Sequence, residues 1–550
     1  MTEPQNLLVA ERRDQILPVL SEAEIGRIGA FGEVRRYRAG ERLFAAGEDV
    51  AGMFVLLKGT ILVSRKDALG HIEPLAELSA GMFLAEMGQL AGQPALVDAE
   101  AKDDVETLLV PREHLRELVI AEDKIGEQIM RALILRRALL IDAQAGGPVL
   151  VGVGASARMV QLQNFLLRNV FPHQLLDSDR DPEAQDLLAR FHLGRDDLPI
   201  VICPSGKVLR NPTEPALARC IGLLFDLDPD RHHDVAIVGA GPAGMAAAVY
   251  GASEGLAVLL LECHAFGGQA GASARIENYL GFPTGISGQA LMGRAYAQAQ
   301  KFGAEMALPL LVESMEAGEG GYRLTTRDGQ RPRARTVVIA GGAVYRRPDV
   351  AGLETYEGSG VHYWATSVEA RLCAGEEIAL VGGGNSAGQA AVYLAGHVHK
   401  VHMLVRGAAL AETMSRYLVD RIAAIPNVEL HLRTEVVAVE GDGRSLCAVT
   451  WRNNRTGVET TAPIRHLFLF IGADPNTNWL SRCALRIDGR GYVLTGAEAG
   501  EGRLPLETSL PGVFAIGDIR SGSTKRVAAA VGEGAQVVQA LHQVLAPVAG

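Results

Sequence analysis

The chain has 550 residues, too many for one hydrophobic core, and a composition of 48% hydrophobic and 21% charged residues excludes a disordered polypeptide. A formal net charge of −11 argues against a nucleic-acid binder. No apolar run reaches the roughly 18 residues of a membrane span, the N-terminus shows no apolar signal sequence, and six cysteines are too few for a disulfide scaffold. We therefore expect a multidomain cytoplasmic protein, with neither a membrane nor a nucleic acid as its partner.

The first section, residues 1–145, has short alternating strands and a C-terminal helix. The run 54–65 alternates in hydrophobicity and is interrupted at Gly59, which predicts a β-hairpin. Residues 112–142 place apolar side chains at helical spacing, which predicts one long helix. A Gly-Gly pair that follows is a plausible hinge.

The second section, residues 148–228, has the order strand, helix, strand, helix, strand. Its helices are expected at 157–169 and 181–191, the latter capped by Asp181. The section closes with two strands joined by a turn at Ser205-Gly206.

The remainder of the chain contains two glycine loops, each placed after a strand and before a helix. In the first, Gly239, Gly241 and Gly244 form G-x-G-x-x-G, and the following strand ends in Glu262. Such a loop lets the backbone and the helix N-terminus approach a pyrophosphate, while the carboxylate accepts hydrogen bonds from a ribose. The first loop therefore predicts a dinucleotide site.

The second loop has Gly382, Gly384 and Ala387, and its next strand ends in Arg406. A cation at this position suits a 2′-phosphate, which favours NADP over NAD; the alternative is a solvated surface arginine. Two dinucleotide sites suggest hydride transfer between a nicotinamide and a tightly held flavin. Near the C-terminus, Asp518 could accept a hydrogen bond from a ribityl hydroxyl, and a helix that begins near Arg526 could direct its positive end at the flavin.

Seven motifs in residues 233–545 follow the order of one known family: GAGPAG (239–244), GGQ (267–269), IENYLGFP (276–283), VVIAGGA (337–343), VGGGNSA (381–387), IGADPNT (471–477) and GVFAIGD (512–518). This half of the chain resembles the low-molecular-weight thioredoxin reductases, which are FAD-dependent disulfide oxidoreductases. The resemblance implies a homodimer with an FAD-binding domain at 232–348 and 469–550, and an inserted NAD(P)H-binding domain at 349–468.

The resemblance also implies which residues contact each cofactor. FAD contacts map to Gly239, Gly241, Pro242, Ala243, Gly244, Glu262, Gly268, Gln269, Asn278, Gly517, Asp518, Arg526 and Val527. NADPH contacts map to Gly382, Gly384, Asn385, Ser386, Ala387 and Arg406. Gly407 and Ala411 replace two further arginines of the family, so NADH becomes a competing donor.

The redox disulfide of the family, C-A-T-C, is replaced here by Trp364, Ala365, Thr366 and Ser367. No two cysteines of the chain form C-x-x-C, so we assign no catalytic residue. A flavin cannot relay electrons through an absent dithiol. Trp364 either packs against the flavin or nicotinamide or is an ordinary packing aromatic.

The second section resembles a thioredoxin or glutaredoxin fold, in which Leu198-Pro199 occupies the cis-proline position. Its own C-x-x-C position holds Ala155, Ser156, Ala157 and Arg158. Cys203 is the sole thiol nearby, and as a single cysteine it is expected to be buried rather than nucleophilic.

The first section resembles a cyclic-nucleotide-binding β-roll, in which Glu86 matches the residue that holds the ribose 2′-hydroxyl. The arginine that pairs with the cyclic phosphate is replaced by Ala95 or Leu96, which argues against a cyclic nucleotide as its ligand. The roll is then a sensor for another ligand or a dimerisation module.

The fold class that follows is multidomain α/β: an N-terminal β-roll, a thioredoxin-like domain and two Rossmann-like dinucleotide-binding domains. The function predicted is transfer of hydride from NAD(P)H to FAD and then to an acceptor that the sequence does not identify. The alternative is a flavin-based redox or nucleotide sensor with little turnover. We expect no metal site, because the histidines at 397, 399 and 402 have no cysteine or carboxylate companion in the sequence.

Overall fold

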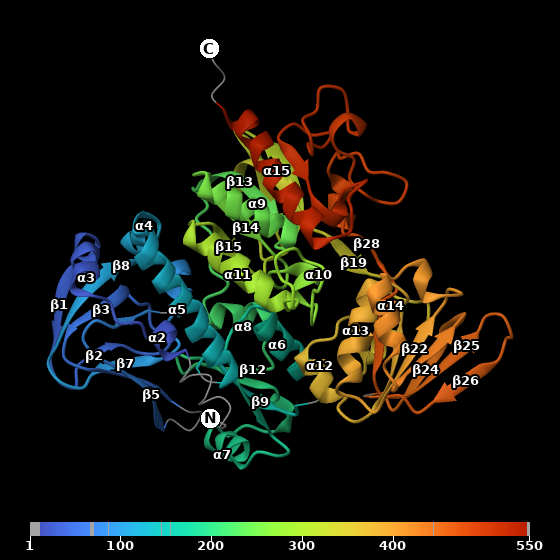
Figure 1. Cartoon of the computed structure of the whole chain (residues 1–550), viewed down its shortest axis with the longest axis horizontal. Helices are drawn as coiled ribbons and strands as arrows, with labels where there is room; N and C mark the ends of the chain where they lie inside the picture. The colour runs from blue at the N-terminus through green and yellow to red at the C-terminus, as the bar shows by residue number, and fades with distance from the viewer. Residues whose placement is uncertain are drawn as a thin grey trace.

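The computed structural model describes residues 12–546, apart from 67–70, 86, 145, 155 and 444. In Figure 1 the N-terminal roll (blue) and the insert (orange) lie on opposite sides of the molecule, and the second section (teal) lies between them. The section that carries the first glycine loop (green-yellow and red) lies above all three. No helix among the described residues is both long enough and apolar enough to span a bilayer.

The roll consists of two four-stranded sheets, so one of our predictions for it is wrong. Gly59 does form a turn, with φ of 89°, but the strands on either side of it pair with different partners in different sheets. The first sheet has the order β1 (Glu33–Tyr37), β8 (Val105–Pro111), β3 (Gly52–Lys58) and β6 (Phe83–Leu84), and the second has β2 (Arg42–Phe44), β7 (Asp98–Ala101), β4 (Ile61–Lys66) and β5 (Ile72–Leu78).

The long helix predicted at the end of the roll is two helices, α4 (Arg112–Ala121) and α5 (Asp123–Asp142). The chain leaves helical geometry at Glu122, where φ is −105° and ψ is 82°. A side chain at Gly126 would overlap the Val119 carbonyl oxygen, so the glycine lets α5 cross close over the end of α4. Helical periodicity continues through such a bend, which is why the sequence pattern concealed it. Two short helices, α2 (Arg13–Ile16) and α3 (Glu22–Ile28), precede the first strand.

The second section has a four-stranded sheet in the order β10-β9-β11-β12. The peptide bond between Leu198 and Pro199 is cis. Asp181 does not cap the following helix with its side chain; its carboxylate accepts from the backbone of Asp177 instead. The elements are β9 (Val149–Gly152), α6 (Ala157–Arg168), β10 (Gln174–Asp177), α7 (Pro182–Arg190), β11 (Ile200–Ile202), β12 (Val208–Arg210) and α8 (Glu214–Cys220).

The first nucleotide section is built on a seven-stranded sheet whose parallel core is β15-β14-β13-β18-β29. Helices α9 (Pro242–Ser253) and α15 (Val527–Leu545) pack against each other beside it, although they are nearly 300 positions apart in sequence (Figure 1). The other elements are β13 (His232–Val238), β14 (Val258–Leu261), α10 (Gly268–Gly271), α11 (Gly288–Lys301), β15 (Glu305–Ala307), β16 (Val312–Gly318), β17 (Gly321–Thr326), β18 (Arg333–Ile339) and β29 (Val513–Ala515).

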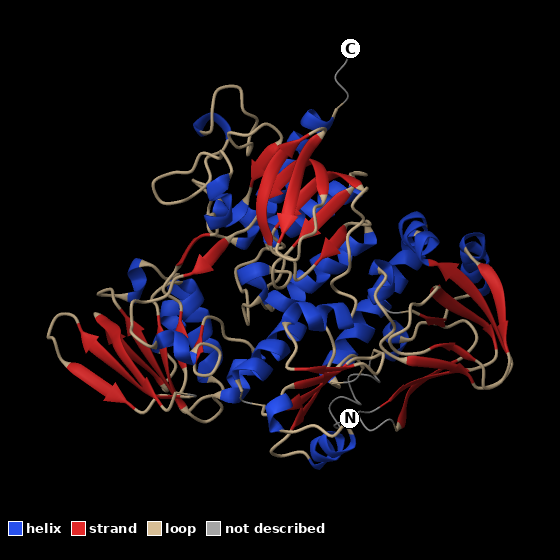
Figure 2. Cartoon of the chain, turned by 180° about the vertical axis from the view of Figure 1, so that it is seen from behind, coloured by secondary structure: helices blue, strands red, loops and turns tan. Residues whose placement is uncertain are grey.

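The insert contains a parallel sheet in the order β20-β27-β21-β22-β23 and a separate three-stranded antiparallel sheet, which Figure 2 shows from behind. The two connections between the insert and the first nucleotide section pair with each other, as β19 (Ala343–Tyr345) and β28 (Ala473–Pro475). The remaining elements are β20 (Val361–His362), α12 (Ser367–Leu372), β21 (Glu377–Val381), α13 (Asn385–Ala395), β22 (Lys400–Val405), α14 (Arg416–Ala423), β23 (Val428–Leu432), β24 (Thr434–Gly441), β25 (Leu446–Asn453), β26 (Glu459–Ala462) and β27 (Leu467–Leu469).

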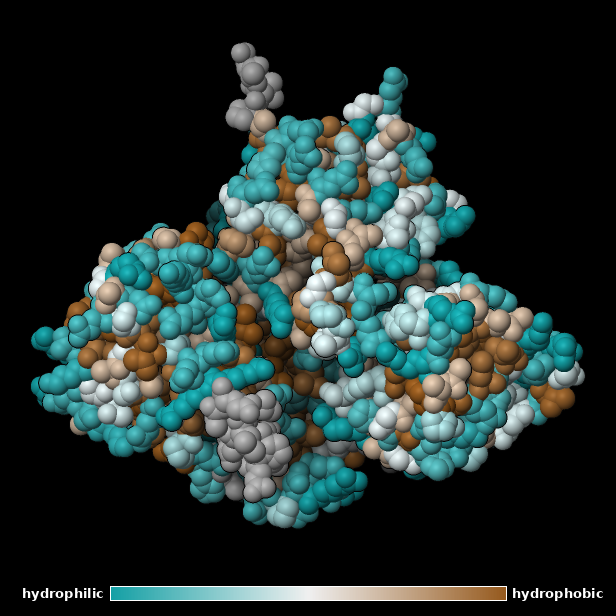
Figure 3. All heavy atoms as spheres, in the orientation of Figure 1, coloured by the Kyte–Doolittle hydropathy of each residue, from teal (hydrophilic) through white to brown (hydrophobic). Residues whose placement is uncertain are grey.

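One hydrophobic core runs from the second section into the first nucleotide section. Buried Leu150, Phe165 and Leu217 of the former belong to the same cluster as Ala236 and Leu261 of the latter. Hydrophilic side chains cover most of the face in Figure 3, and hydrophobic ones show in the hollow where the lobes meet. Burial of apolar surface on this scale fixes the second section against the nucleotide section.

Candidate active site

The first glycine loop has the geometry that a dinucleotide requires. Gly239 follows β13 with φ of 110°, and a side chain at Gly244 would overlap the Gly239 carbonyl oxygen, so α9 lies close against the end of the strand. A Cβ at Gly241 would meet no atom within 4 Å. Gly241 is the N-cap residue of α9, and the backbone N–H groups and dipole at a helix N-terminus favour an anion.

A cavity of about 640 Å³ lies in front of this loop, a size suited to a cofactor. It brings together every residue predicted to contact FAD except Gly244, whose role is packing. They are Gly239, Gly241, Pro242, Ala243, Glu262, Gly268, Gln269, Asn278, Gly517, Asp518, Arg526 and Val527.

The second glycine loop reaches the same cavity. Asn385 and Ser386, the first residues of α13, line it together with the residues predicted to contact FAD. Gly382, Gly384, Ala387 and Arg406 do not line it. The positions predicted for the two cofactors therefore adjoin, as direct hydride transfer would require.

The carboxylate of Glu262 is held in place at the end of β14. It accepts hydrogen bonds from the backbone N–H of Ala240 at 2.8 Å and of His264 at 3.0 Å. Because these donors fix both oxygens beside the loop, the carboxylate lies where a ribose would meet it.

The C-terminal motif brings a carboxyl group and an ammonium to the cavity. Burial raises the pKa of Asp518, and Lys525 donates to the Asp518 backbone carbonyl oxygen. The Lys525 ammonium also lies 4.6 Å from the ring centroid of Tyr492. Sequence reasoning missed Lys525, although it immediately precedes Arg526.

Arg168, the last residue of α6, is a second residue of the cavity that sequence reasoning missed. Its guanidinium donates to the Gly268 carbonyl oxygen at 2.9 Å and lies 5.6 Å from the ring centroid of Trp364. Burial lowers the pKa of this guanidinium. The contact depends on packing between sections 100 positions apart, so no local pattern in the sequence indicates it.

The segment expected at the position of the family dithiol also lines the cavity, through Trp364 and Ala365. The buried carboxylate of Glu369 fixes the position of this segment. One of its oxygens accepts hydrogen bonds from the Trp364 indole at 3.1 Å and from the Asn164 side chain at 2.7 Å. The other oxygen accepts from the backbone N–H of Thr366 at 2.9 Å. A buried charge needs such partners. Asn164 belongs to α6, so the second section helps to fix Trp364 at the cavity.

The cysteines supply no dithiol at this cavity. Cys203, which is buried as expected, is not the single thiol we predicted, because it forms a disulfide with Cys220. Neither residue lines the cavity. Cys263 does, but the Glu262 charge and burial raise the pKa of its thiol, and burial raises the pKa of Cys373 to about 12. A raised pKa favours the protonated form of these two thiols, which is the less nucleophilic form.

A second cavity, of about 1270 Å³, adjoins the first on the side of α6. The two share His264, Val344, Tyr345, Trp364 and Asn476 as lining residues. Trp364 thus lies between the cofactor cavity and the space beside the second section.

In the roll, Ala95 and Leu96 are buried at the place predicted for the missing arginine. Glu86, predicted to match the ribose-binding glutamate, lies outside the described residues.

Residues 233–534 match the family model described as pyridine nucleotide-disulphide oxidoreductase, and residues 34–122 match the cyclic nucleotide-binding domain. The chain is 32% identical over 305 residues to a thioredoxin reductase of Listeria innocua, a match that covers 56% of this chain and 91% of that protein. It is also 33% identical over 307 residues to NADPH-dependent thioredoxin reductase 3 of Arabidopsis thaliana, covering 55% of this chain and 56% of that protein. The solved structure of Lactococcus lactis thioredoxin reductase in its FR conformation covers 57% of this chain and 98% of its own, with 29% identity and a TM-score of 0.52.

Proposed function

The chain belongs to the pyridine nucleotide-disulphide oxidoreductase family, and we propose that it oxidises NAD(P)H through FAD and passes the electrons to an acceptor without a dithiol of its own at the active site. The observation that carries this proposal is that both glycine loops contribute to one cavity, which Trp364 and Ala365 also line. When bound, FAD would accept a hydride from NAD(P)H and supply two electrons to the acceptor.

The chain's own residues would bind and orient the two nucleotides. The N-terminus of α9 would face the FAD pyrophosphate, and Glu262 would accept from its ribose. Asn385 and Ser386 at the start of α13 would hold the nicotinamide nucleotide, and Arg406 would favour its 2′-phosphate. Arg168 and Lys525 add positive charge to the cavity, which favours an anionic cofactor.

The second cavity supports a route for the acceptor. It adjoins the cofactor cavity at Trp364 and Tyr345 and is bounded on the other side by α6. An acceptor that enters there would approach the cofactors across the Trp364 indole. The candidate acceptors are dioxygen, a quinone, a one-electron carrier and a disulfide.

Anaerobic stopped-flow reduction of the FAD-loaded protein tests this proposal. We expect NADPH to bleach the flavin band quickly and NADH to do so more slowly, and at least one of the four acceptors to restore the band. The matched control is Gly384→Val, which places a side chain in the open space of the second loop and should abolish bleaching while FAD content stays unchanged.

Absence of bleaching in FAD-loaded protein would contradict the proposal. Bleaching that none of the four acceptors reverses would instead support the alternative, a sensor with little turnover.

A further inference from the structure

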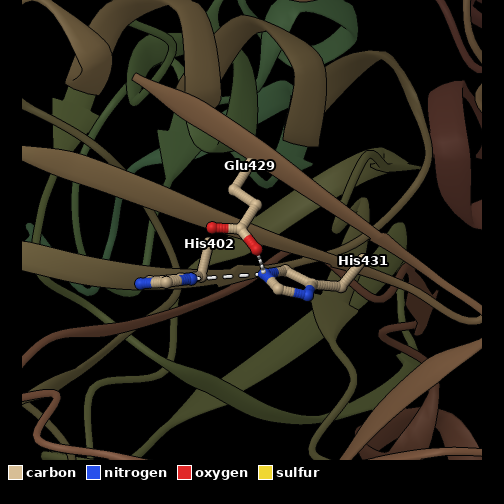
Figure 4. Close-up of side chains that lie close together, drawn as sticks. All are labelled: His402, Glu429 and His431. Atoms are coloured by element: carbon tan, nitrogen blue, oxygen red, sulfur yellow. Dashed lines mark hydrogen bonds and ion pairs between the residues drawn. The ribbon is translucent and has the colours of Figure 1, made fainter. Parts of the chain in front are cut away.

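We propose that His402, Glu429 and His431 form a binding site for a divalent transition-metal ion, Zn²⁺ by the chemistry of its donors, on one face of the insert sheet. Figure 4 shows the two imidazole rings directed at each other and the Glu429 carboxylate directed at the same point. The three potential ligand atoms all lie within 4.8 Å of one another. None of the three residues lines either cavity of the active site.

The register of the parallel sheet brings these side chains together. His402 of β22 pairs directly with Glu429 of β23, and His431 lies two positions after Glu429. Because side chains alternate along a strand, all three lie on the same face of the sheet. The histidines are 29 residues apart in sequence, which is why the spacing of 397, 399 and 402 gave no indication of this set.

Two of the three distances between the potential ligand atoms are close to those in a tetrahedral zinc site. His402 Nδ1 lies 3.2 Å from His431 Nε2, and Glu429 Oε1 lies 3.5 Å from the same His431 nitrogen. A tetrahedral ion with bonds of about 2.0–2.1 Å separates its ligand atoms by about 3.4 Å. An ion could therefore bind all three ligands after small side-chain movements, with a water as the fourth ligand.

Neighbouring groups prepare the ligands for an ion. Glu377 of β21 accepts from His402 Nε2 at 3.0 Å, which puts the ring proton on that nitrogen and leaves Nδ1 with its lone pair toward the site. Lys400 pairs with the other oxygen of Glu429, which leaves Oε1 facing His431. This carboxylate–histidine arrangement is the usual support of a metal-binding imidazole.

Burial gives the site a protected side and an open side. The side chain of His402 is 9% exposed and that of His431 21%, whereas Glu429 is 48% exposed. The Trp451 ring of β25 covers the two imidazoles, with centroids 5.4 and 5.5 Å from theirs. An ion would enter beside Glu429 and tie β22 to β23. Its role would be to stabilise the insert, since it lies away from the cofactors.

The test uses the untagged full-length protein, stripped of metal with a chelator and titrated with Zn²⁺ by calorimetry and with Co²⁺ by visible absorption. We expect one equivalent of Zn²⁺ to bind, Co²⁺ to give the intense visible band of a tetrahedral site, and Trp451 fluorescence to change on binding. The thermal midpoint of the apoprotein should rise with Zn²⁺, since a ligand that binds only the folded state stabilises it.

Variants locate the site. His431→Ala should abolish stoichiometric binding, and Glu377→Gln should weaken it about 10- to 100-fold, the usual effect of losing a supporting carboxylate. Glu429→Gln removes an exposed ligand with little risk to folding and should weaken binding too. His399→Ala, an exposed histidine of the preceding turn, is the matched control and should leave binding unchanged.

Either of two results would overturn the proposal: wild-type protein that takes up no Zn²⁺ or Co²⁺, or folded Glu429→Gln and His431→Ala proteins that bind as well as wild type.

Discussion

The two glycine loops of this chain share a backbone geometry but differ in the charge that follows them. Gly239 and Gly382 both have positive φ, and a side chain at either would collide with the carbonyl oxygen of the residue that follows a neighbouring strand. The next strand ends in Glu262 after the first loop and in exposed Arg406 after the second. A loop of this geometry suits a pyrophosphate in both cases, and we propose that the residue at the strand end distinguishes the nucleotide.

The loops also differ in how much of each reaches the cavity. The first contributes almost all of its predicted contacts, and the second contributes only Asn385 and Ser386. We interpret this as a site that surrounds a resident cofactor with most of its predicted contacts, beside a site that meets an exchanging cofactor through fewer of them. Four changes to the chain test this comparison.

The largest effect is expected from Gly244→Ala in the first loop. The added Cβ would overlap the Gly239 carbonyl oxygen and force α9 away from β13. We expect purified protein without FAD and with a lower thermal midpoint, measured by absorbance and calorimetry. Gly532→Ala, at an exposed helical position where a Cβ meets nothing within 4 Å, is the control and should retain FAD. Retention of FAD by Gly244→Ala would refute the packing argument.

The next largest effect is expected from Arg406→Ala at the end of β22. This change should raise the KM for NADPH about tenfold, which corresponds to about 1.4 kcal/mol. The KM for NADH should stay unchanged. The reason is loss of the one cation predicted to meet the 2′-phosphate. Steady-state rates with a dye acceptor measure both constants. Equal changes for the two nucleotides would mean that Arg406 is a solvated surface residue.

Arg168 contacts both regions that are compared here. Its guanidinium donates to the Gly268 carbonyl oxygen beside the first loop and lies near the Trp364 ring in the insert. Arg168→Ala should cost about 1 kcal/mol in FAD binding, about fivefold in the dissociation constant. Fluorescence titration of the apoprotein with FAD measures it. Arg180→Ala, at an exposed position of the second section, serves as the control. If it weakened FAD binding as much as Arg168→Ala does, Arg168 would have no specific role in FAD binding.

Trp364→Cys combined with Ser367→Cys restores the spacing of the missing dithiol. A disulfide formed there adds one two-electron couple. Anaerobic titration should then consume two equivalents of NADPH per FAD, against one for wild type. Unchanged stoichiometry in a variant shown by mass spectrometry to contain the disulfide would indicate that this segment does not exchange electrons with the flavin.

The sequence was sufficient to predict the parts of this site that are local. Each glycine loop needs only a strand, a turn and a helix that follow one another. Gly239, Gly241 and Glu262, which the sequence grouped in one dinucleotide site, lie on one cavity. The same holds for Asp518, which follows the last strand of the sheet.

Features that depend on packing between distant segments were not predicted. Arg168 reaches the cavity only because α6 packs against the nucleotide section. Cys203 and Cys220 come close enough to form their disulfide only in the folded second section. His402 and His431 meet through strand register. The segment 112–142 breaks into two helices at Glu122, and Gly126 lets the second helix cross close over the first.

The most direct test of the central claim is the number of electrons that the wild-type protein accepts. Under anaerobic conditions FAD-loaded protein is titrated with NADPH while the flavin band and the free thiols are followed. We predict complete reduction at one NADPH per FAD, with the Cys203–Cys220 disulfide unchanged, because neither of its cysteines lines the cavity. Uptake of two NADPH per FAD with the appearance of two thiols would show that electrons leave through a disulfide of this chain, and would contradict the account.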